Sequence, residues 1–184
     1  MNHKAFKMKL KSSYIKALAV FIVSLSISCS ERTDQSSDRT SEEKVSDALQ
    51  KKINLDTIRL VELSKEASRA TEEWMMYIAL NSEIERFDNY TVLDVINNAE
   101  TFNSVVDSLT ETVPKRFETN AVKARLITLK THSELLNENS SRIEPKTATI
   151  EDISAKLKLD FNNLNIQLNE VIILEDNTNA NTSN

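Results

Sequence analysis

The sequence predicts an all-α protein, arranged as an antiparallel up-down-up-down four-helix bundle. The chain has no glycine and only two prolines in 184 residues, which disfavours the tight hairpin turns of a protein built from many short strands. Apolar residues recur at spacings of three and four over long stretches, as on one face of a helix. The links between these stretches are short, and short links make neighbouring helices antiparallel.

The first long helix is expected from near Asp56 to about Phe87, with residues 46–53 as an earlier helical turn or extension. Its apolar stripe consists of Leu60, Leu63, Ala67, Ala70, Trp74, Tyr77 and Ile84. The run from Trp74 to Ile78 is apolar on all sides of a helix, so we expect this part to be deeply packed.

The second helix has the clearest periodicity, because its apolar residues alternate strictly between spacings of three and four. These residues are Val92, Val95, Ala99, Phe102, Val106, Leu109 and Val113. The positions between them are mostly polar, as expected for an amphipathic helix. Asp88 or Asn89 is placed to cap its start, and Pro114 closes it.

Two further helices are expected after Pro114. Thr119 is placed to cap the third, which ends in the polar residues 137–141 and carries Val122, Leu126, Leu129 and Leu136. The fourth follows Pro145, with Thr149 and Asp152 spaced like a capping box. Its apolar stripe consists of Ile150, Ile153, Leu157, Phe161, Leu164, Leu168 and Val171.

The heptad regularity of these stripes also fits a second architecture, an extended helical hairpin or a coiled-coil dimer that shares its core. Under either arrangement the folded domain is expected to span residues 46–176. The polar residues 177–184 are expected to form a disordered tail.

The first 28 residues have the anatomy of a secretion signal. Five lysines precede an uncharged apolar run from Ala17 to Ile27, and this run is too short to span a membrane permanently. The order Leu25-Ser26-Ile27-Ser28-Cys29 resembles the lipobox of bacterial lipoproteins, in the looser form found in flavobacteria and their relatives.

The resemblance implies that residues 1–28 are removed and that Cys29 carries the lipid. Acyl chains on Cys29 would then hold the protein on the membrane. Residues 29–45 are polar and are expected to form a disordered tether. The implied location is the cell envelope, as an outer-membrane lipoprotein facing the periplasm or the cell surface.

The charge of the mature chain bears on its partners. Loss of the signal removes five lysines and leaves 18 basic residues against 28 acidic ones. Because nucleic-acid binding needs a basic face to displace counterions, no nucleic-acid partner is expected. A protein of the envelope remains a possible partner, and the oligomeric state is not predicted.

The residues needed for common catalytic motifs are scarce. A chain without glycine cannot contain the glycine-rich phosphate loops or the nucleophile elbow of hydrolases. Lipidation would consume Cys29, the single cysteine, and His132 is the single histidine after the signal. We therefore expect no enzyme, no cofactor and no metal site. Haem ligation by His132 with Met75 or Met76 is the alternative, but core filling is the commoner role of methionine.

Three residues form the candidate site. Arg125 and His132 fall on one helical row with Leu129, at the edge of the apolar stripe. A partly buried Arg125 needs an anionic neighbour. We favour a structural ion pair with a glutamate of the first helix over an anion-binding pocket. The candidate glutamates are Glu72, Glu73 and Glu83. Trp74, like Tyr77, is interpreted as core rather than as a ligand-stacking platform.

Two functional hypotheses follow from the sequence. The first is a non-enzymatic envelope lipoprotein whose helical domain binds another protein or serves a structural role. The second is a small-ligand module, in which a pocket near Arg125, His132 and Trp74 holds an anion, a lipid or a cofactor.

Overall fold

The computed structural model describes residues 44–182, and the side chains of residues 44–179. The expected signal, Cys29 and nearly all of the tether lie outside the described residues. The helices are α3 (Lys65–Thr71), α4 (Met75–Phe87), α5 (Val92–Glu111), the 3₁₀ helix η1 (Lys115–Phe117), α6 (Asn120–Ser140) and α7 (Thr147–Thr182). The described residues contain no named strand, so the all-α class is confirmed.

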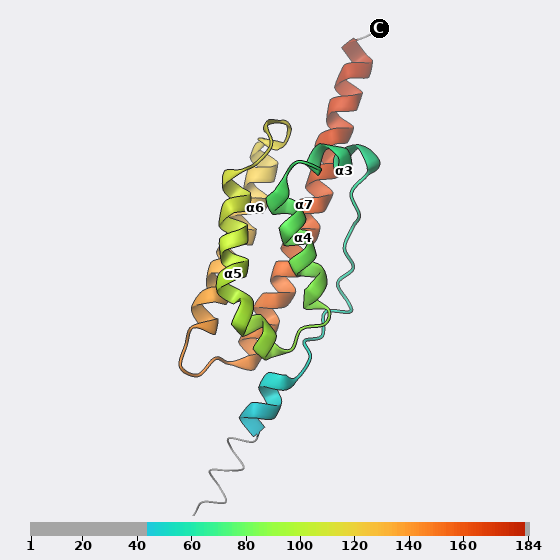
Figure 1. Ribbon diagram of the computed structural model, residues 1–184. Coiled ribbons are helices and arrows are strands. Elements are labelled where there is room, and N and C mark those ends of the chain that lie inside the picture. Colours follow the sequence, from blue (N-terminus) through green and yellow to red (C-terminus); the bar gives the residue numbers. More distant parts are fainter. Residues whose placement is uncertain (1–43, 183–184) are drawn as a thin grey trace, which may run out of the picture. The chain divides into compact units, whose positions relative to one another are not determined.

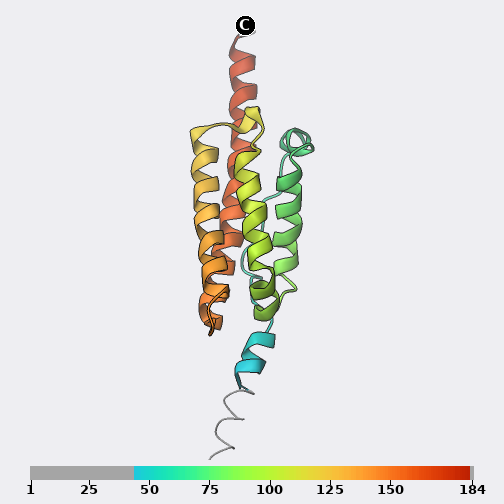
Figure 2. The ribbon, with the colours of Figure 1, turned by 60° about the vertical axis from the view of Figure 1, so that its left-hand side comes forward.

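Helices α4, α5, α6 and α7 lie side by side, and successive helices run in alternate directions (Figures 1 and 2). α7 contacts each of the other three, and it also contacts α3. Its 36 residues correspond to about 54 Å at 1.5 Å per residue. It therefore continues past the ends of α5 and α6 (Figure 2).

The expected helix from Asp56 to Phe87 is not continuous. Residues 53–64 are not helical, and α3 begins only at Lys65, where the Ser64 hydroxyl accepts a hydrogen bond from the Ala67 N–H at 3.1 Å. α3 ends at Thr71, and α4 starts after Trp74. The apolar spacing correctly placed α4 but could not distinguish a helix from the packed, non-helical segment before α3.

Residues 44–50 form a short helical segment, which begins within the expected tether. Ile53 lies outside it and is buried in the core. The neighbouring backbone pairs with the turn before α5, through hydrogen bonds from the Ile53 N–H to the Tyr90 carbonyl and from the Val92 N–H to the Lys51 carbonyl, both 3.0 Å.

α5 is capped by Thr91 rather than by the expected Asp88 or Asn89. The Thr91 hydroxyl accepts from the Asp94 N–H at 3.2 Å, and the Asp94 carboxylate accepts from the Thr91 N–H at 2.8 Å. This reciprocal pair is a capping box. The backbone and side-chain hydrogen bonds from Thr91 hold the pKa of the Asp94 carboxyl below its usual value. Asp88 instead ends α4 and pairs with Lys158.

The starts of α6 and α7 differ in how well the sequence predicted them. Thr119 caps α6 as expected, accepting from the Val122 N–H at 3.2 Å. α7 begins at Thr147, so Thr149 lies inside its first turn and does not cap it. α7 also continues through residues 177–182, which were expected to form a disordered tail.

Every long helix contributes apolar residues to one core, and the apolar stripes expected for α5 and α7 are buried, except that Val113 lies beyond α5 and is only partly buried. Trp74 and Tyr77 are buried as expected, but Met75 and Ile78 are 63% and 42% exposed. The expectation that the whole run packs deeply is wrong, because α4 starts here and one of its faces is in solvent. Within the described part of the chain, no helix is long and apolar enough to cross a membrane.

Candidate functional site

The structure does not gather Arg125, His132 and Trp74 into one site. The three residues share no partner among the described residues: Trp74 contacts Tyr77, Phe117 and Thr112, whereas His132 contacts Asp160. None of the three cavities described below is lined by any of these three residues.

Arg125 is exposed on α6, and no hydrogen bond or ion pair joins its side chain to another described residue. The expected ion pair with a glutamate of the first predicted helix is not formed, and Glu83 pairs instead with Arg86 at 2.6 Å. A guanidinium that stays in water has no desolvation penalty to offset, so Arg125 needs neither a carboxylate nor an anionic ligand.

His132 does have an acidic partner, but it comes from α7. His132 Nδ1 lies 2.5 Å from Asp160 Oδ2, and the Asp160 side chain is only 9% exposed. Burial raises the pKa of the Asp160 carboxyl, while the hydrogen bond and charge of His132 act in the opposite direction. The pair ties α6 to α7 and fixes the orientation of the imidazole.

Trp74 is a core residue, as the sequence suggested. It is 2% exposed and stacks on Tyr77 and Phe117, with ring centroids 5.7 and 6.3 Å apart. Its Nε1–H donates to the Thr112 hydroxyl at 3.2 Å, which satisfies the indole. Tyr77 extends the stack to Phe161, at 5.5 Å.

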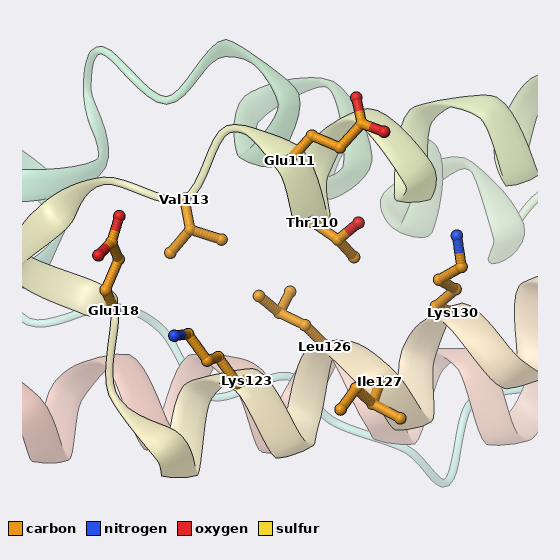
Figure 3. A pocket seen from close by; sticks show the side chains of 8 residues that line it. All are labelled: Thr110, Glu111, Val113, Glu118, Lys123, Leu126, Ile127 and Lys130. Atoms are coloured by element: carbon orange, nitrogen blue, oxygen red, sulfur yellow. The ribbon is translucent and has the colours of Figure 1, made fainter.

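A cavity of about 560 Å³ lies between α5 and α6 (Figure 3). Its apolar part consists of Val113, Leu126 and Ile127, and Figure 3 shows Leu126 pointing into it. Charges of both signs surround this part, from Glu111, Glu118, Lys123 and Lys130.

The two lysines of this cavity differ in their partners. Lys130 pairs with Asp107 at 2.5 Å and with Glu134 at 3.7 Å, and the hydrogen bond that the Lys130 ammonium donates to Asp107 raises its pKa. The Lys123 ammonium has no hydrogen-bonding or ion-pair partner among the described residues. A second cavity, of about 550 Å³, lies where the start of α6 meets the C-terminal part of α7, next to the 2.6 Å ion pair of Arg116 and Glu175.

The most unusual feature is a row of asparagines on α7 that binds backbone. We call Asn162, Asn165 and Asn169 the amide row, and residues 53–64 the strap. The strap runs along α7 in the same direction as the helix (Figure 1). Four hydrogen bonds join the row to strap backbone, and all four use side-chain amides.

Each amide of the row has a defined partner. Asn162 Oδ1 accepts from the Val61 N–H at 2.7 Å, and Asn165 Nδ2 donates to the Val61 carbonyl at 2.9 Å. Asn169 makes two bonds, donating to the Glu62 carbonyl at 3.0 Å and accepting from the Ser64 N–H at 2.8 Å. Side chains here replace the neighbouring strand that extended backbone normally pairs with.

The spacing of the row explains why it fits extended chain. Asn162 and Asn169 are seven residues apart, which is about 10.5 Å along a helix. Their partners Val61 and Ser64 are three residues apart, which is about 10 Å along an extended chain. Two turns of helix therefore match three residues of extended backbone.

Each end of the strap is held by burial. At the first end Ile53 and Leu55 are each 2% exposed. Lys158, which is buried on α7, donates to the Leu55 carbonyl at 3.4 Å and pairs with Asp88 at 2.5 Å. At the other end the strap enters α3, where Ala67 is fully buried.

A third cavity, of about 560 Å³, lies between the strap, α3 and α4. Strap residues Leu60 and Leu63 line it together with Tyr77 and Asn165. The Tyr77 hydroxyl donates to Asn165 Oδ1 at 2.9 Å, which leaves Asn165 Nδ2 for the Val61 carbonyl. Burial and the charge of Glu85 raise the pKa of the Tyr77 hydroxyl, so Tyr77 remains a neutral donor.

The outer face of α7 carries an apolar stripe of Leu159, Ile166 and Ile173, exposed by 47%, 36% and 57%. The three residues are spaced by seven, so they share one face of the helix. Leu174 beside them is 64% exposed. We call Leu159, Ile166 and Ile173 the outer stripe.

Sequence reasoning missed both the amide row and the outer stripe. The sequence did contain a signal for the row, since asparagine is a poor helix former and three asparagines recur at helical spacing within the predicted fourth helix. The outer stripe was hidden because α7 is apolar on several faces. No protein-family model, curated protein sequence or solved structure matches this chain, so the proposals below rest on its own residues and geometry.

Proposed function

We propose that this protein is a lipid-anchored, non-enzymatic interaction module of the cell envelope. The anchor is Cys29, and the lipobox-like order of residues 25–29 supports it. The implied location is the outer membrane, on its periplasmic or outer surface. The body of the module is an antiparallel four-helix bundle of α4, α5, α6 and α7, supported by their alternating directions and their common core.

The observation that carries the interaction role is the outer stripe of α7. Two helical turns separate each residue of the stripe from the next, and each is at least 36% exposed. Apolar side chains repeated on one exposed helical face are typical of a surface that another protein covers. The same helix contributes its other apolar residues to the core, which keeps the stripe on a rigid support.

The spacing of the stripe indicates the chemistry of the partner. Seven residues is also the period of the contact seam between two packed helices, and the outer stripe supplies one apolar residue per period. We therefore propose that the partner presents an amphipathic helix with its own apolar stripe, and that it belongs to another envelope protein. The polar neighbours Asn163 and Glu170 on α7 would lie at the rim of this contact.

The proposal is tested by site-specific photo-crosslinking in cells that express the full chain. A photoreactive residue at Ile166 should give one discrete adduct, with the crosslink mapping to a helix of an envelope protein. The matched control is Thr128, which is exposed on α6. Adducts that are absent at Ile166, or equally abundant at Thr128, would overturn the role of the outer stripe.

The lipid anchor has a separate test. The intact mass of the protein extracted from membranes should correspond to a chain that starts at an acylated Cys29. A Cys29→Ser variant should lose this modification and appear in the soluble fraction. A mature chain that starts elsewhere, or that lacks acyl groups, would contradict the anchor without affecting the outer stripe.

A second candidate function is the binding of a small amphiphilic anion, for which the α5–α6 cavity provides a site. It combines the apolar residues Leu126 and Ile127 with the unpaired ammonium of Lys123 (Figure 3). This cavity replaces the expected pocket near Arg125, His132 and Trp74. A fluorescent fatty acid should bind the protein and lose affinity in Lys123→Glu but not in Arg125→Glu; equal binding by both variants would exclude this site.

A further inference from the structure

We propose that the amide row of α7 is a binding site for extended polypeptide backbone, and that the strap occupies this site in the resting protein. A partner with an extended segment would bind there by displacing residues 58–64. This site is distinct from the outer stripe, and the inference does not depend on the lipid anchor.

The row recognises backbone rather than side chains. All four hydrogen bonds between the row and the strap go to N–H and carbonyl groups of the strap, and none goes to a strap side chain. Because every residue except proline offers the same two groups, such contacts tolerate many sequences. Recognition of an extended peptide through its main chain is an established mode of binding at sheet edges; here helical asparagines provide the donors and acceptors.

The middle of the strap is held less firmly than its ends. Val61, Glu62 and Ser64 are exposed, and Leu60 and Leu63 are only partly buried. The flanking anchors, Leu55 and the buried face of α3, are fully packed. Segments with few buried apolar contacts open at a lower free energy than the rest of a fold, so the middle of the strap can leave α7 while both ends stay in place.

The cavity under the strap adds a preference for the incoming segment. Leu60 and Leu63 line this cavity together with Thr71, Tyr77 and Ile78. Displacement of the strap withdraws both leucines from it. The segment that fits is therefore extended and has apolar side chains three residues apart, in the register that places its backbone on the amide row.

Occupation by the strap makes the resting protein self-blocked. A segment tethered beside its own site has a high effective concentration, and a competitor binds only to the fraction of molecules in which the site is open. Weakening the strap should therefore increase the affinity for an external peptide, even though no residue of the row is changed.

The test uses the full chain with the substitution Val61→Pro. Proline removes the N–H that donates to Asn162, yet it is compatible with an extended backbone. The probe is a fluorescein-labelled peptide with the natural sequence of residues 56–66. Fluorescence anisotropy should show binding to the Val61→Pro variant at least tenfold tighter than to the wild-type protein, and exchange of the Ser64 amide hydrogen should accelerate.

Matched variants on α7 separate the amide row from the rest of the helix. In the Val61→Pro background, Asn169→Ala or Asn165→Ala should weaken peptide binding at least tenfold, with helix content unchanged by circular dichroism. Asn163→Ala, on the same helix but outside the row, should leave binding unchanged. The proposal is overturned if the Val61→Pro variant does not bind the peptide, if its Ser64 amide stays protected, or if the row variants bind as well as Asn163→Ala.

Discussion

His132 and Asp160 form a pair across the interface of α6 and α7, with His132 Nδ1 2.5 Å from Asp160 Oδ2. The pair combines the single histidine of the expected site with an acid that no sequence pattern indicated. Because Asp160 is almost fully buried, its ionisation is linked to the stability of the fold.

Asp160 should make the protein less stable as the pH rises above the ordinary aspartate pKa of 3.8. Burial raises the pKa of Asp160 in the folded state, so between pH 3.8 and that raised value the folded protein binds more protons than the unfolded chain. The free energy of unfolding therefore falls across this window. Urea denaturation from pH 3 to 6 should show this fall relative to Asp160→Asn.

A second variant checks the cause of this pH dependence. His132 opposes the upward shift in the pKa of Asp160. His132→Ala should therefore raise that pKa further and enlarge the decrease in the free energy of unfolding with rising pH. Identical pH profiles for the wild-type protein and Asp160→Asn would show that Asp160 does not contribute.

The capping box of α5 should be measurable in a single substitution. Thr91→Ala removes the hydroxyl that accepts from the Asp94 N–H, and loss of such a cap costs about 1 kcal/mol in the free energy of unfolding. Urea denaturation is the measurement. Thr101→Ala, at an exposed position within α5, is the control and should change stability by less than about 0.5 kcal/mol. A similar loss of stability in Thr91→Ala and Thr101→Ala would contradict the stabilising role of the capping box.

Two neighbouring residues of α7 should differ sharply in their contribution to stability. Phe161 is fully buried and stacks on Tyr77, so Phe161→Ala should cost about 3–5 kcal/mol in the free energy of unfolding. Leu159 belongs to the outer stripe, and Leu159→Ala should cost less than about 1 kcal/mol. Thermal and urea denaturation of the purified variants test this contrast. A large loss of stability in Leu159→Ala would show that the outer stripe is part of a core.

The pair of Lys158 and Asp88 should respond differently according to which partner is removed. Asp88→Ala leaves a buried ammonium without its carboxylate, which costs about 1–3 kcal/mol. Lys158→Met keeps the apolar length of the side chain and removes the charge, so its cost should be smaller. Urea denaturation of the two variants and the double variant measures the coupling. A larger loss of stability in Lys158→Met than in Asp88→Ala would show that the buried ammonium is not the costly partner of the pair.

Sequence patterns alone determined the helical class and the start of α6. The strict three-four spacing from Val92 to Val106 correctly predicted α5, because an amphipathic helix must bury one continuous stripe. Thr119 correctly predicted the start of α6, because a cap acts on an N–H only three residues away. Both signals depend only on residues close together in the chain, so they can be recognised from the sequence alone.

The tertiary structure decided what the local pattern left undetermined. Leu60 and Leu63 fit a helical stripe, yet they lie in the strap, because Asn162 and Asn169 bind its backbone from more than 100 residues away in the sequence. Asp160 was likewise selected as the partner of His132 by the packing of α6 on α7. The sequence determines which segments can form helices, and only long-range packing decides which backbone groups are satisfied within a helix and which are bound by another element.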